Sequence, residues 1–524
     1  MTASEQLAQF AAGSKALPKL CREYKKERAT VHLKELVGGA LSFYAAAAVA
    51  KTGGVHIFVA EDRDAAAYLL NDFYNLLDEK QVYFFPSSYK RSAAYGAEDA
   101  QGVVQRTTAM NAVRGFTKGY LVVCTYPEAL AERVVDAATL QRDTIAVKLG
   151  DKISIAVLED ALADANFTRV DFVYEPGQYS VRGGIVDVFS YSESKPYRID
   201  FFGDEVDSIR RFNISSQLSA DKLDRVEIVP NLNAGEAPRV SFVQFAGSSA
   251  TCWFYDADYV LRRVNDLRRK VLADMEEPGQ IDRLLTSRNV LLRDMAGNSV
   301  VALRDNLPER PATAAVVFDT APQPKFNKNF EMLADDMIRN SLRGYATYIL
   351  SENKVQVERL ENIFHQIGRG QAAVRSLSVT LHEGFVDNDL KLCLYTDHQI
   401  FDRYQRYRIN GEIRRDEQMT VAELNQLRPG DYVVHIDHGV GRFDGLVKIN
   451  ENGKVHEAIK LVYKDGDVLF VNVHSLHRIS RYKSGDGEPP KVYKLGNGAW
   501  QKLKNAAKKA VKDISRELIA LYAK

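Results

Sequence analysis

The chain has 524 residues, and at roughly 100–200 residues per domain this length predicts three to five domains. Hydrophobic residues make up 45% and charged residues 27% of the sequence, as in ordinary globular proteins. Because 70 basic residues balance 69 acidic ones, the composition excludes a uniformly basic nucleic-acid-binding protein, and any such surface must be local.

The four cysteines lie far apart and form no CxxC pair, which argues against a disulfide framework and against a cysteine-rich zinc site (Cys21, Cys124, Cys252 and Cys393). The beginning of the chain lacks the basic-then-apolar pattern of a signal peptide. Apolar runs such as Tyr44–Ala50 are much shorter than the ~20 residues that span a bilayer. We therefore expect a soluble, cytoplasmic chain.

Residues 1–144 alternate short apolar runs with stretches of helical periodicity, such as Ala65–Leu77 and Gln105–Val113. The predicted strands are Val55–Ala60, Val82–Phe85 and Tyr120–Cys124. Strands connected through helices in this way predict a parallel α/β sheet.

The pattern changes over residues 145–228, where a short helix, Ala156–Ala165, precedes several strands separated by glycines. The predicted strands are Thr168–Tyr174, Gly184–Phe189, Tyr197–Phe202 and Val206–Phe212, which predict a small α+β domain of hairpins. Residues 229–325 return to a mixed α/β pattern, and residues 326–415 form a second alternating α/β series.

Residues 425–484 contain closely spaced short strands, which predict a small β-barrel of SH3 or Tudor type. These strands are Tyr432–His435, Gly441–Ile449, His456–Tyr463 and Val468–Val473. Residues 496–524 then predict an amphipathic helix with lysines beside its apolar face. The helical pattern continues to Lys524 without a glycine cap, so we expect the chain to be a fragment of a longer protein.

Two segments resemble known families. Gly430–Tyr482, with GDYVVHIDHGVGRFDGL and LVYKDGDVLFVNVHSLHRISRY, resembles the polymerase-interacting domain of bacterial transcription-repair coupling factors (Mfd) and of CarD-type regulators. Arg182–Phe189 (RGGIVDVF) and Tyr197–Phe212 (YRIDFFGDEVDSIRRF) resemble the excision-repair protein UvrB and the UvrB-like module of the same factors. The resemblance implies that residues 1–144 and 229–325 form one UvrB-like domain, and that residues 496–524 form a relay helix.

The resemblance implies an adaptor that binds stalled RNA polymerase through its β subunit and recruits UvrA for nucleotide-excision repair. Complete members of the family carry an ATP-dependent DNA translocase, which supplies most of the contact with double-stranded DNA, and a further domain that masks the UvrA-binding face. Two alternatives remain open: a UvrB-like ATP-dependent DNA-repair enzyme and a CarD-like transcription regulator.

The predicted UvrA-binding residues are Arg169, Tyr179, Arg182 and Phe189, which match family positions in the small domain. Arginine suits such an interface because its planar fork makes bidentate contacts with carboxylates, and adjacent aromatic rings add packing. Ser180 stands where UvrB has another arginine. The alternative interpretation is an ordinary solvated strand face.

The predicted polymerase-binding residues are Leu446, Val447, Lys448 and Ile449, on a strand that runs into a polar turn. A strand of this kind at a sheet edge accepts a further strand from a partner. In the family this strand pairs with the polymerase β subunit, and Ile449 occupies the apolar contact position. The alternative is that Ile449 belongs to the core.

Where UvrB has its phosphate loop, this sequence keeps Gly38 and Gly39 but lacks the lysine and the Ser or Thr that follow it. Without that lysine the β- and γ-phosphates lose their cationic partner, and the sequence has no other GxxxxGK[ST] motif. We therefore expect a helix-entry turn, no catalytic residues and no cofactor, with ATP and Mg²⁺ belonging to the absent motor.

Three other groups of residues suggest chemistry that we consider less favoured. His435 with His438, and His474 with His477, have the HxxH spacing, but residues three apart on a strand point to opposite faces, so we expect no metal. The acidic residues near Gly203 fit a hairpin turn better than a catalytic site (Asp200, Asp204, Glu205 and Asp207). The lysines of residues 496–524 either contact DNA phosphates or remain solvated.

Overall fold

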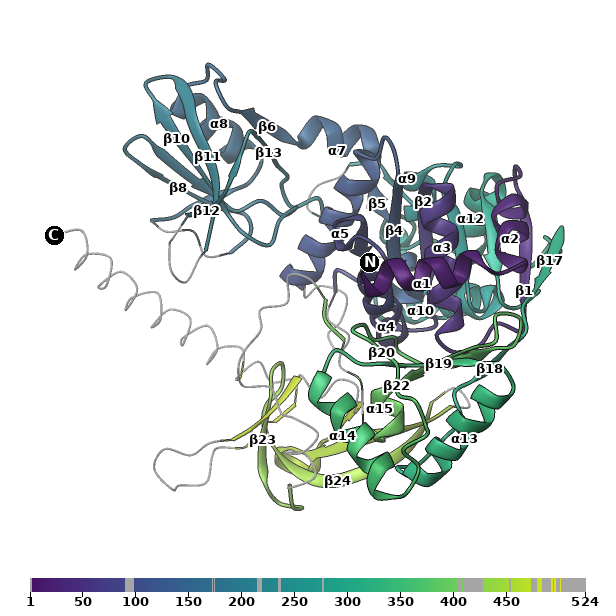
Figure 1. Cartoon of the computed structure of the whole chain (residues 1–524). Coiled ribbons are helices and arrows are strands. Elements are labelled where there is room, and N and C mark those ends of the chain that lie inside the picture. Colours follow the sequence, from purple (N-terminus) through teal and green to yellow (C-terminus); the bar gives the residue numbers. More distant parts are fainter. Residues whose placement is uncertain are drawn as a thin grey trace. The chain divides into compact units, whose positions relative to one another are not determined.

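The computed structural model describes residues 2–89, 99–171, 173, 175–213, 219–233, 237–275, 278–403, 405, 407–409, 427–451, 454–472, 478–482, 492, 494–495 and 500. The chain forms two compact units (Figure 1). The first comprises Met1–Asp402 with Tyr407–Glu412, and the second comprises Arg403–Arg406 with Ile413–Lys524. The predicted helix after Trp500 lies outside the described residues.

The first unit contains a seven-stranded parallel sheet in the order β17-β1-β16-β15-β2-β4-β3. Its strands are β1 (Thr30–Lys34), β2 (Gly54–Val59), β3 (Val82–Phe84), β4 (Tyr120–Thr125), β15 (Thr251–Phe254), β16 (Ser299–Ala302) and β17 (Ala314–Val317). Strands from before and after the small domain are therefore interleaved within one sheet, with β16 and β15 between β1 and β2. The inner strands are continuously hydrophobic because helices cover both faces of a parallel sheet.

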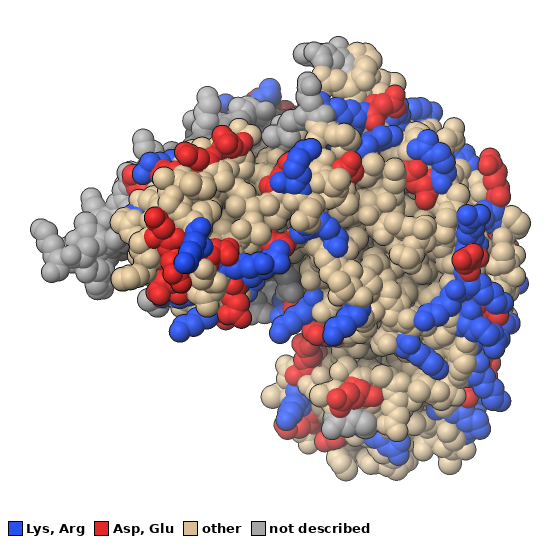
Figure 2. Space-filling view, turned by 90° about the horizontal axis from the view of Figure 1, so that it is seen from above, with Lys and Arg blue, Asp and Glu red and all other residues tan. Residues whose placement is uncertain are grey.

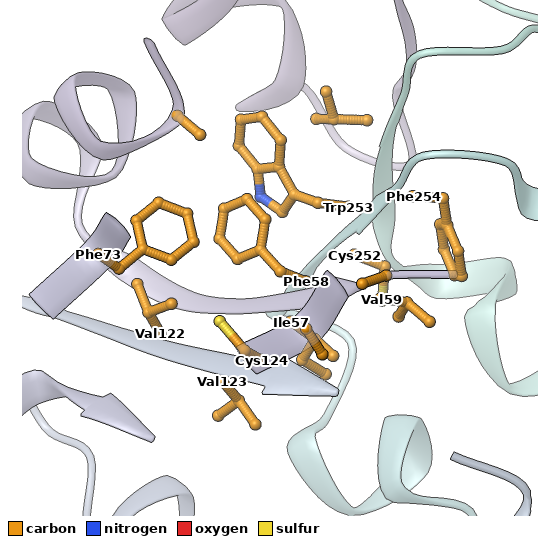
Figure 3. Close-up of a cluster of buried hydrophobic side chains, with 14 of the residues drawn as sticks. Ile57, Phe58, Val59, Phe73, Val122, Val123, Cys124, Cys252, Trp253 and Phe254 are labelled. Carbon is orange, nitrogen blue, oxygen red and sulfur yellow. The ribbon is translucent and has the colours of Figure 1, made fainter. Parts of the chain in front are cut away.

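The helices of this α/β domain pack their apolar faces on the sheet. They are α1 (Ala3–Ala12), α2 (Ala16–Tyr24), α3 (Ala40–Thr52), α4 (Arg63–Leu76), α5 (Ala100–Arg114), α6 (Pro127–Ala131), α7 (Ala137–Asp143), α9 (Phe242–Ala246), α10 (Ala257–Asp274), α11 (Ile281–Leu284) and α12 (Arg288–Asp294). Phe58 on β2 stacks on Trp253 of β15 with ring centroids 4.9 Å apart, and Phe73 of α4 packs on the other side (Figure 3). The ring of Phe73 thus anchors α4 to the centre of the sheet.

The small domain is a six-stranded sheet in the order β12-β11-β10-β9-β8-β7, with α8 (Ile155–Asp164) on one face. Its strands are β7 (Thr168–Arg169), β8 (Gln178–Arg182), β9 (Ile185–Val188), β10 (Tyr197–Phe202), β11 (Glu205–Phe212) and β12 (Ser219–Leu223). The chain enters and leaves through the antiparallel pair β6 (Ile145–Lys148) and β13 (Arg225–Ile228).

The strand predicted at Thr168–Tyr174 is shorter than predicted, although it lies beside β8 as expected. Strand β7 has only two residues and runs parallel to β8, so it is not part of a hairpin. The N–H of Val170 still donates to the carbonyl of Tyr179 at 2.9 Å, but Val173 packs with Phe189 and Phe212. Burial of this valine in a separate apolar cluster competes with continued strand pairing.

The second α/β domain has a five-stranded mixed sheet in the order β18-β21-β22-β19-β20. Its elements are β18 (Thr320–Pro322), α13 (Phe330–Leu342), β19 (Ala346–Leu350), α14 (Lys354–Gln366), β20 (Ser376–Leu377), β21 (Phe385–Asp387), β22 (Leu392–Thr396) and α15 (Asp397–Ile400). The two helices α13 and α14 contribute Leu333, Met337 and Phe364 to a core shared with Tyr395 of β22.

The second unit is a five-stranded antiparallel sheet in the order β26-β25-β24-β23-β27. Its strands are β23 (Tyr432–His435), β24 (Gly439–Glu451), β25 (Lys454–Val462), β26 (Val468–Asn472) and β27 (Ile479–Arg481). Its core includes Phe443, Ile459 and Leu461. The four predicted strands are present within two residues of their predicted ends, and β27 is an addition.

Within the described part of the chain, none of the helices has the length and apolar character needed to cross a bilayer. Basic and acidic side chains lie next to each other over much of the face seen in Figure 2, with a denser group of basic side chains at its right. The mixed surface agrees with the balanced composition.

Candidate protein-interaction sites

One face of the small domain carries a row of polar residues that crosses five strands. Ser180, Asp187, Arg198, Arg210 and Lys222 are successive cross-strand partners from β8 to β12. Arg182, two residues after Ser180, lies on the same face because side chains alternate along a strand. The opposite face packs on α8, so this polar face is the side of the sheet that α8 leaves uncovered.

Asp187 is the buried centre of this row, with only 1% of its side chain exposed. Arg198 donates to it through Nε and Nη2, at 2.7 and 2.9 Å, and Arg182 donates to the same carboxylate. The guanidinium group of Arg198 also lies 4.4 Å above the ring of Phe212. Arg210 is paired separately with Asp200. The face therefore presents fixed guanidinium groups.

The four residues predicted to bind UvrA lie on two different faces of the sheet. Arg169 is the register partner of Tyr179, and both belong to the face on which α8 packs. Arg169 is 61% exposed and its Nη1 lies 2.5 Å from Glu159 of α8. Arg182 and Phe189 belong to the opposite face. The sequence alone did not show that Arg169 and Tyr179 lie on one face of the sheet and that Arg182 and Phe189 lie on the other.

The two aromatic residues of this set are buried. Tyr179 is 4% exposed and packs in the core beneath α8, and burial raises the pKa of its hydroxyl. Phe189 is 5% exposed and packs with Val173 and Phe212. Both rings occupy core positions, whereas the side chains of Arg169 and Arg182 are 61% and 35% exposed.

The four residues predicted to bind polymerase lie together on β24, after a β-bulge between Phe443 and Leu446. Gly445 allows this irregularity with a φ of +99°, where a side chain would be strained. Residues 446–449 pair with β25 on one edge. In the described part of the sheet, β23 pairs only with residues 439–442 of the other edge.

The side chains on this open edge are mixed in character. Leu446 is 46% exposed and Lys448 is exposed, whereas Val447 and Ile449 are partly buried. Ile449 lies outside the described core cluster around Phe443 and Leu461. Among the described residues, no strand pairs with 446–449 on this edge, which therefore presents backbone groups together with apolar side chains.

The degenerate phosphate loop lies between β1 and α3 and is filled by another segment of the chain. A Cβ placed on Gly39 would lie 2.1 Å from the carbonyl oxygen of Glu383, and one on Gly38 would lie 3.1 Å from that of Gly384. Gly38 itself has a φ of +56°. The segment Leu381–Gly384 of the second α/β domain thus covers the turn where a nucleotide phosphate would otherwise approach the helix.

Buried polar contacts hold this segment in place. The backbone N–H of His382 donates to Asp72 Oδ1 at 2.6 Å, and the hydroxyl of Ser42 donates to Asp72 Oδ2 at 2.6 Å. The ring of His382 stacks on Tyr68 with centroids 3.8 Å apart. Burial raises the pKa of Asp72 to about 7. Sequence reasoning missed this contact because it joins residues from two domains.

The first HxxH pair lies close together, with the rings of His435 and His438 4.7 Å apart. The rule that residues three apart on a strand point to opposite faces does not apply here, because β23 ends at His435. Burial lowers the pKa of His438. No cluster of three metal-binding side chains occurs among the described residues, which exclude His474 and His477. Trp500 donates to the carbonyl of Ile436 at 3.1 Å.

The acidic residues near Gly203 surround a hairpin turn, where Gly203 has a φ of +62°. Asp200 accepts from Ser208 and Arg210, and Glu205 lies opposite Lys152 in an isolated bridge. These contacts give the carboxylate of Asp200 structural partners, whereas the bridge at Glu205 is a backbone contact. The neighbouring Arg198 and Arg211 pair with Asp187 and Glu193 instead.

Comparison with known proteins agrees with these two sites. Residues 145–233 match the UvrB interaction domain, and residues 427–483 match the CarD-like/TRCF RID domain. The chain is 24% identical to the transcription-repair-coupling factors of Bacillus subtilis and of Escherichia coli, over 94% of this chain and 48% of each relative. The factor from Staphylococcus haemolyticus is 25% identical over 87% of this chain and 45% of its own length.

The chain therefore spans about half the length of the curated relatives that it matches. The resemblance inferred from Gly430–Tyr482 and from Arg182–Phe212 is confirmed. Both matched domains occur in this chain, and the similarity extends over the α/β domains around them.

Proposed function

We propose that this chain is the adaptor region of a transcription-repair coupling factor, which binds RNA polymerase with its second unit and UvrA with its small domain. The observation that carries the proposal is the open edge of β24 at residues 446–449, inside the segment that matches the CarD-like/TRCF RID domain. The match of residues 145–233 to the UvrB interaction domain supports the second half of the proposal.

The proposed polymerase contact is addition of a strand from the β subunit to β24. Main-chain hydrogen bonds on an open edge supply affinity, and side chains beside it supply specificity. Leu446 and Lys448 would meet the partner on one side of the added strand, and Val447 and Ile449 on the other. We further propose that the sheet closes as a small barrel of SH3 or Tudor type, with the bulge before Leu446 bending β24.

Replacing Ile449 by arginine should weaken polymerase binding at least about tenfold, because a partly buried apolar contact would become a charge that must lose its water. The measurement is a titration of RNA polymerase with the purified chain, accompanied by a circular dichroism spectrum. Val468→Arg on β26 is the matched control, since Val468 is an exposed valine on the opposite edge strand.

Wild-type affinity in a folded Ile449→Arg protein would contradict the proposed edge contact. Loss of the folded spectrum would instead assign Ile449 to the core. If Val468→Arg loses polymerase binding to the same extent, then a new charge elsewhere on this sheet is sufficient to weaken binding.

The proposed UvrA contact is made by arginine side chains, with the rings of Tyr179 and Phe189 supporting them from the core. Arg182→Ala and Arg169→Ala should each weaken binding to UvrA, because each removes a guanidinium fork from the surface. Arg225→Ala is the control, because Arg225 is 50% exposed, has an ion pair and lies outside the six-stranded sheet. A double variant of Arg169 and Arg182 that binds UvrA normally would refute this assignment.

We also propose that the chain itself does not hydrolyse ATP, and that contact with double-stranded DNA belongs mainly to a motor region of the kind that the family resemblance implies for the complete factor. The missing lysine after Gly39 and the close approach of Glu383 to this glycine support the first part. A cytoplasmic location completes the proposal, since both proposed partners act on DNA.

A further inference from the structure

We propose that Asp187 is the positioning residue of the UvrA-binding face: it holds Arg182 and Arg198 as a preformed pair of guanidinium forks for carboxylates of the partner. The inference rests on the proposed function, because it assumes that Arg182 contacts UvrA. It adds that the arrangement of the arginines, and not only their charge, determines the affinity.

The position of Asp187 in the sheet makes this role possible. Strand β9 lies between β8 and β10, and Asp187 is the register partner of Ser180 on one side and of Arg198 on the other. Its carboxylate thus lies between the strands that carry Arg182 and Arg198. The hydroxyl of Ser180 donates its proton to the carbonyl of Asp171 at 2.8 Å and not to the carboxylate of Asp187.

The burial of Asp187 explains why its ion pairs with Arg182 and Arg198 are costly to break. A carboxylate that is 1% exposed has lost its water and must be compensated by paired charge and hydrogen bonds. Arg198 provides two charge-assisted hydrogen bonds in a bidentate geometry, and Arg182 provides another. Release of either arginine would leave the carboxylate less compensated, which disfavours other rotamers of both side chains.

The two arginines are held to different degrees. Arg198 is 14% exposed and lies against the fully buried ring of Phe212, so it forms the inner part of the pair. Arg182 is 35% exposed and forms the outer part. Because two cations share one anion, the group retains a net positive charge that is directed outwards at Arg182. A partner that binds there meets an arginine whose side-chain entropy has already been reduced.

Attraction by net charge and positioning of the arginines predict opposite effects of Asp187→Asn on UvrA binding. The substitution removes a negative charge, so attraction of an acidic partner by net charge alone would tighten binding. If Asp187 acts by positioning, the substitution releases Arg182 and weakens binding. Asp200→Asn is the matched control, because Asp200 is an arginine-paired carboxylate on the same sheet face that contacts Arg210 instead.

The test is a titration of UvrA with the full chain and with Asp187→Asn, Arg182→Ala, the double variant and Asp200→Asn. We expect Asp187→Asn to weaken binding about tenfold, and the double variant to bind within about twofold of Arg182→Ala, because coupled residues are not additive. Asp200→Asn should bind as tightly as the unmodified chain or more tightly. A merely structural role of Asp187 would weaken binding further in the Arg182→Ala background.

Normal or tighter binding by Asp187→Asn, while Arg182→Ala is weakened, would overturn the inference and leave the proposed function intact. Equal weakening by Asp200→Asn would also overturn it. Normal binding by Arg182→Ala would instead refute the proposed contact itself. If Asp187→Asn does not fold, the Arg182→Lys variant distinguishes the two explanations, because lysine keeps the charge but has no guanidinium fork. A loss of UvrA binding close to that of Arg182→Ala would support the positioning role of Asp187. Normal UvrA binding would show that charge alone is sufficient, which would overturn the inference.

Discussion

Replacing Gly39 by alanine should lower the free energy of unfolding of the first unit by roughly 3 kcal/mol or more. A Cβ at this position would lie 2.1 Å from the carbonyl oxygen of Glu383, so the backbone of the second α/β domain would have to move. Gly39 has a φ of −65°, which alanine adopts freely. The loss would therefore come from the contact and not from backbone strain. Urea denaturation followed by circular dichroism measures it.

Gly279→Ala is the matched control for this substitution, because a Cβ on Gly279 would meet no atom within 4 Å. We expect the control to unfold at nearly the urea concentration of the unmodified chain. If Gly39→Ala is as stable as Gly279→Ala, then the segment Leu381–Gly384 is not seated against the degenerate phosphate loop. Protease cleavage within that segment should increase in Gly39→Ala and stay unchanged in the control.

Replacing Asp72 by asparagine should stabilise the first unit at alkaline pH. Burial raises the pKa of Asp72 from 3.8 to about 7, so its charged form is less favourable in the folded protein than in the unfolded chain. Its contribution to stability is therefore fully present below pH 3.8 and is lost as the pH rises through 7. The advantage of the asparagine variant should grow by roughly 2–3 kcal/mol between pH 5 and pH 8.

The contacts of Asp72 explain why asparagine suits the site. In its protonated form Asp72 can donate to the hydroxyl of Ser42, which in turn donates to the carbonyl of Gly39 at 3.0 Å. An asparagine amide reproduces this donor, and its oxygen still accepts from the N–H of His382. Urea denaturation at a series of pH values measures the difference between the two proteins.

Asp164→Asn is the control for the pH series, because Asp164 is exposed on α8. Its unfolding curve should follow that of the unmodified chain at each pH. A constant difference between Asp72→Asn and the unmodified chain from pH 5 to pH 8 would contradict a raised pKa for Asp72. Lower stability of the variant at pH 8 would show that the carboxylate is preferred there.

The strands of the second unit were predictable because turn residues separate them. Asn450–Lys454 and Lys464–Asp467 stand between apolar runs, and the strand at Tyr432–His435 has the predicted bounds. Strand β27 was missed because Ile479–Arg481 is short and pairs with β23 from far along the chain. Pairings of this kind depend on tertiary contacts that local patterns do not encode.

The interaction residues were predictable by type but not by arrangement. Arg182 stands out because it precedes two glycines in a segment that resembles UvrB, whereas Asp187 lies in an ordinary strand sequence. The role of Asp187 depends on the register of β9 with β10, which brings Arg198 opposite to it. Gly38 and Gly39 predicted a turn. The backbone of Glu383, which lies against Gly39, belongs to another domain, so the local sequence did not predict this contact.

The strand order of the large sheet has a consequence for synthesis on the ribosome. Strands β1 and β2 are separated in the sheet by β16 and β15, which are encoded after the small domain. A nascent chain that has emerged only to β4 therefore has a vacant space of two strands at the centre of its sheet. The small domain, whose six strands are contiguous in sequence, can complete its own sheet during this interval. The first domain to begin synthesis can thus be completed only after the second has been synthesised.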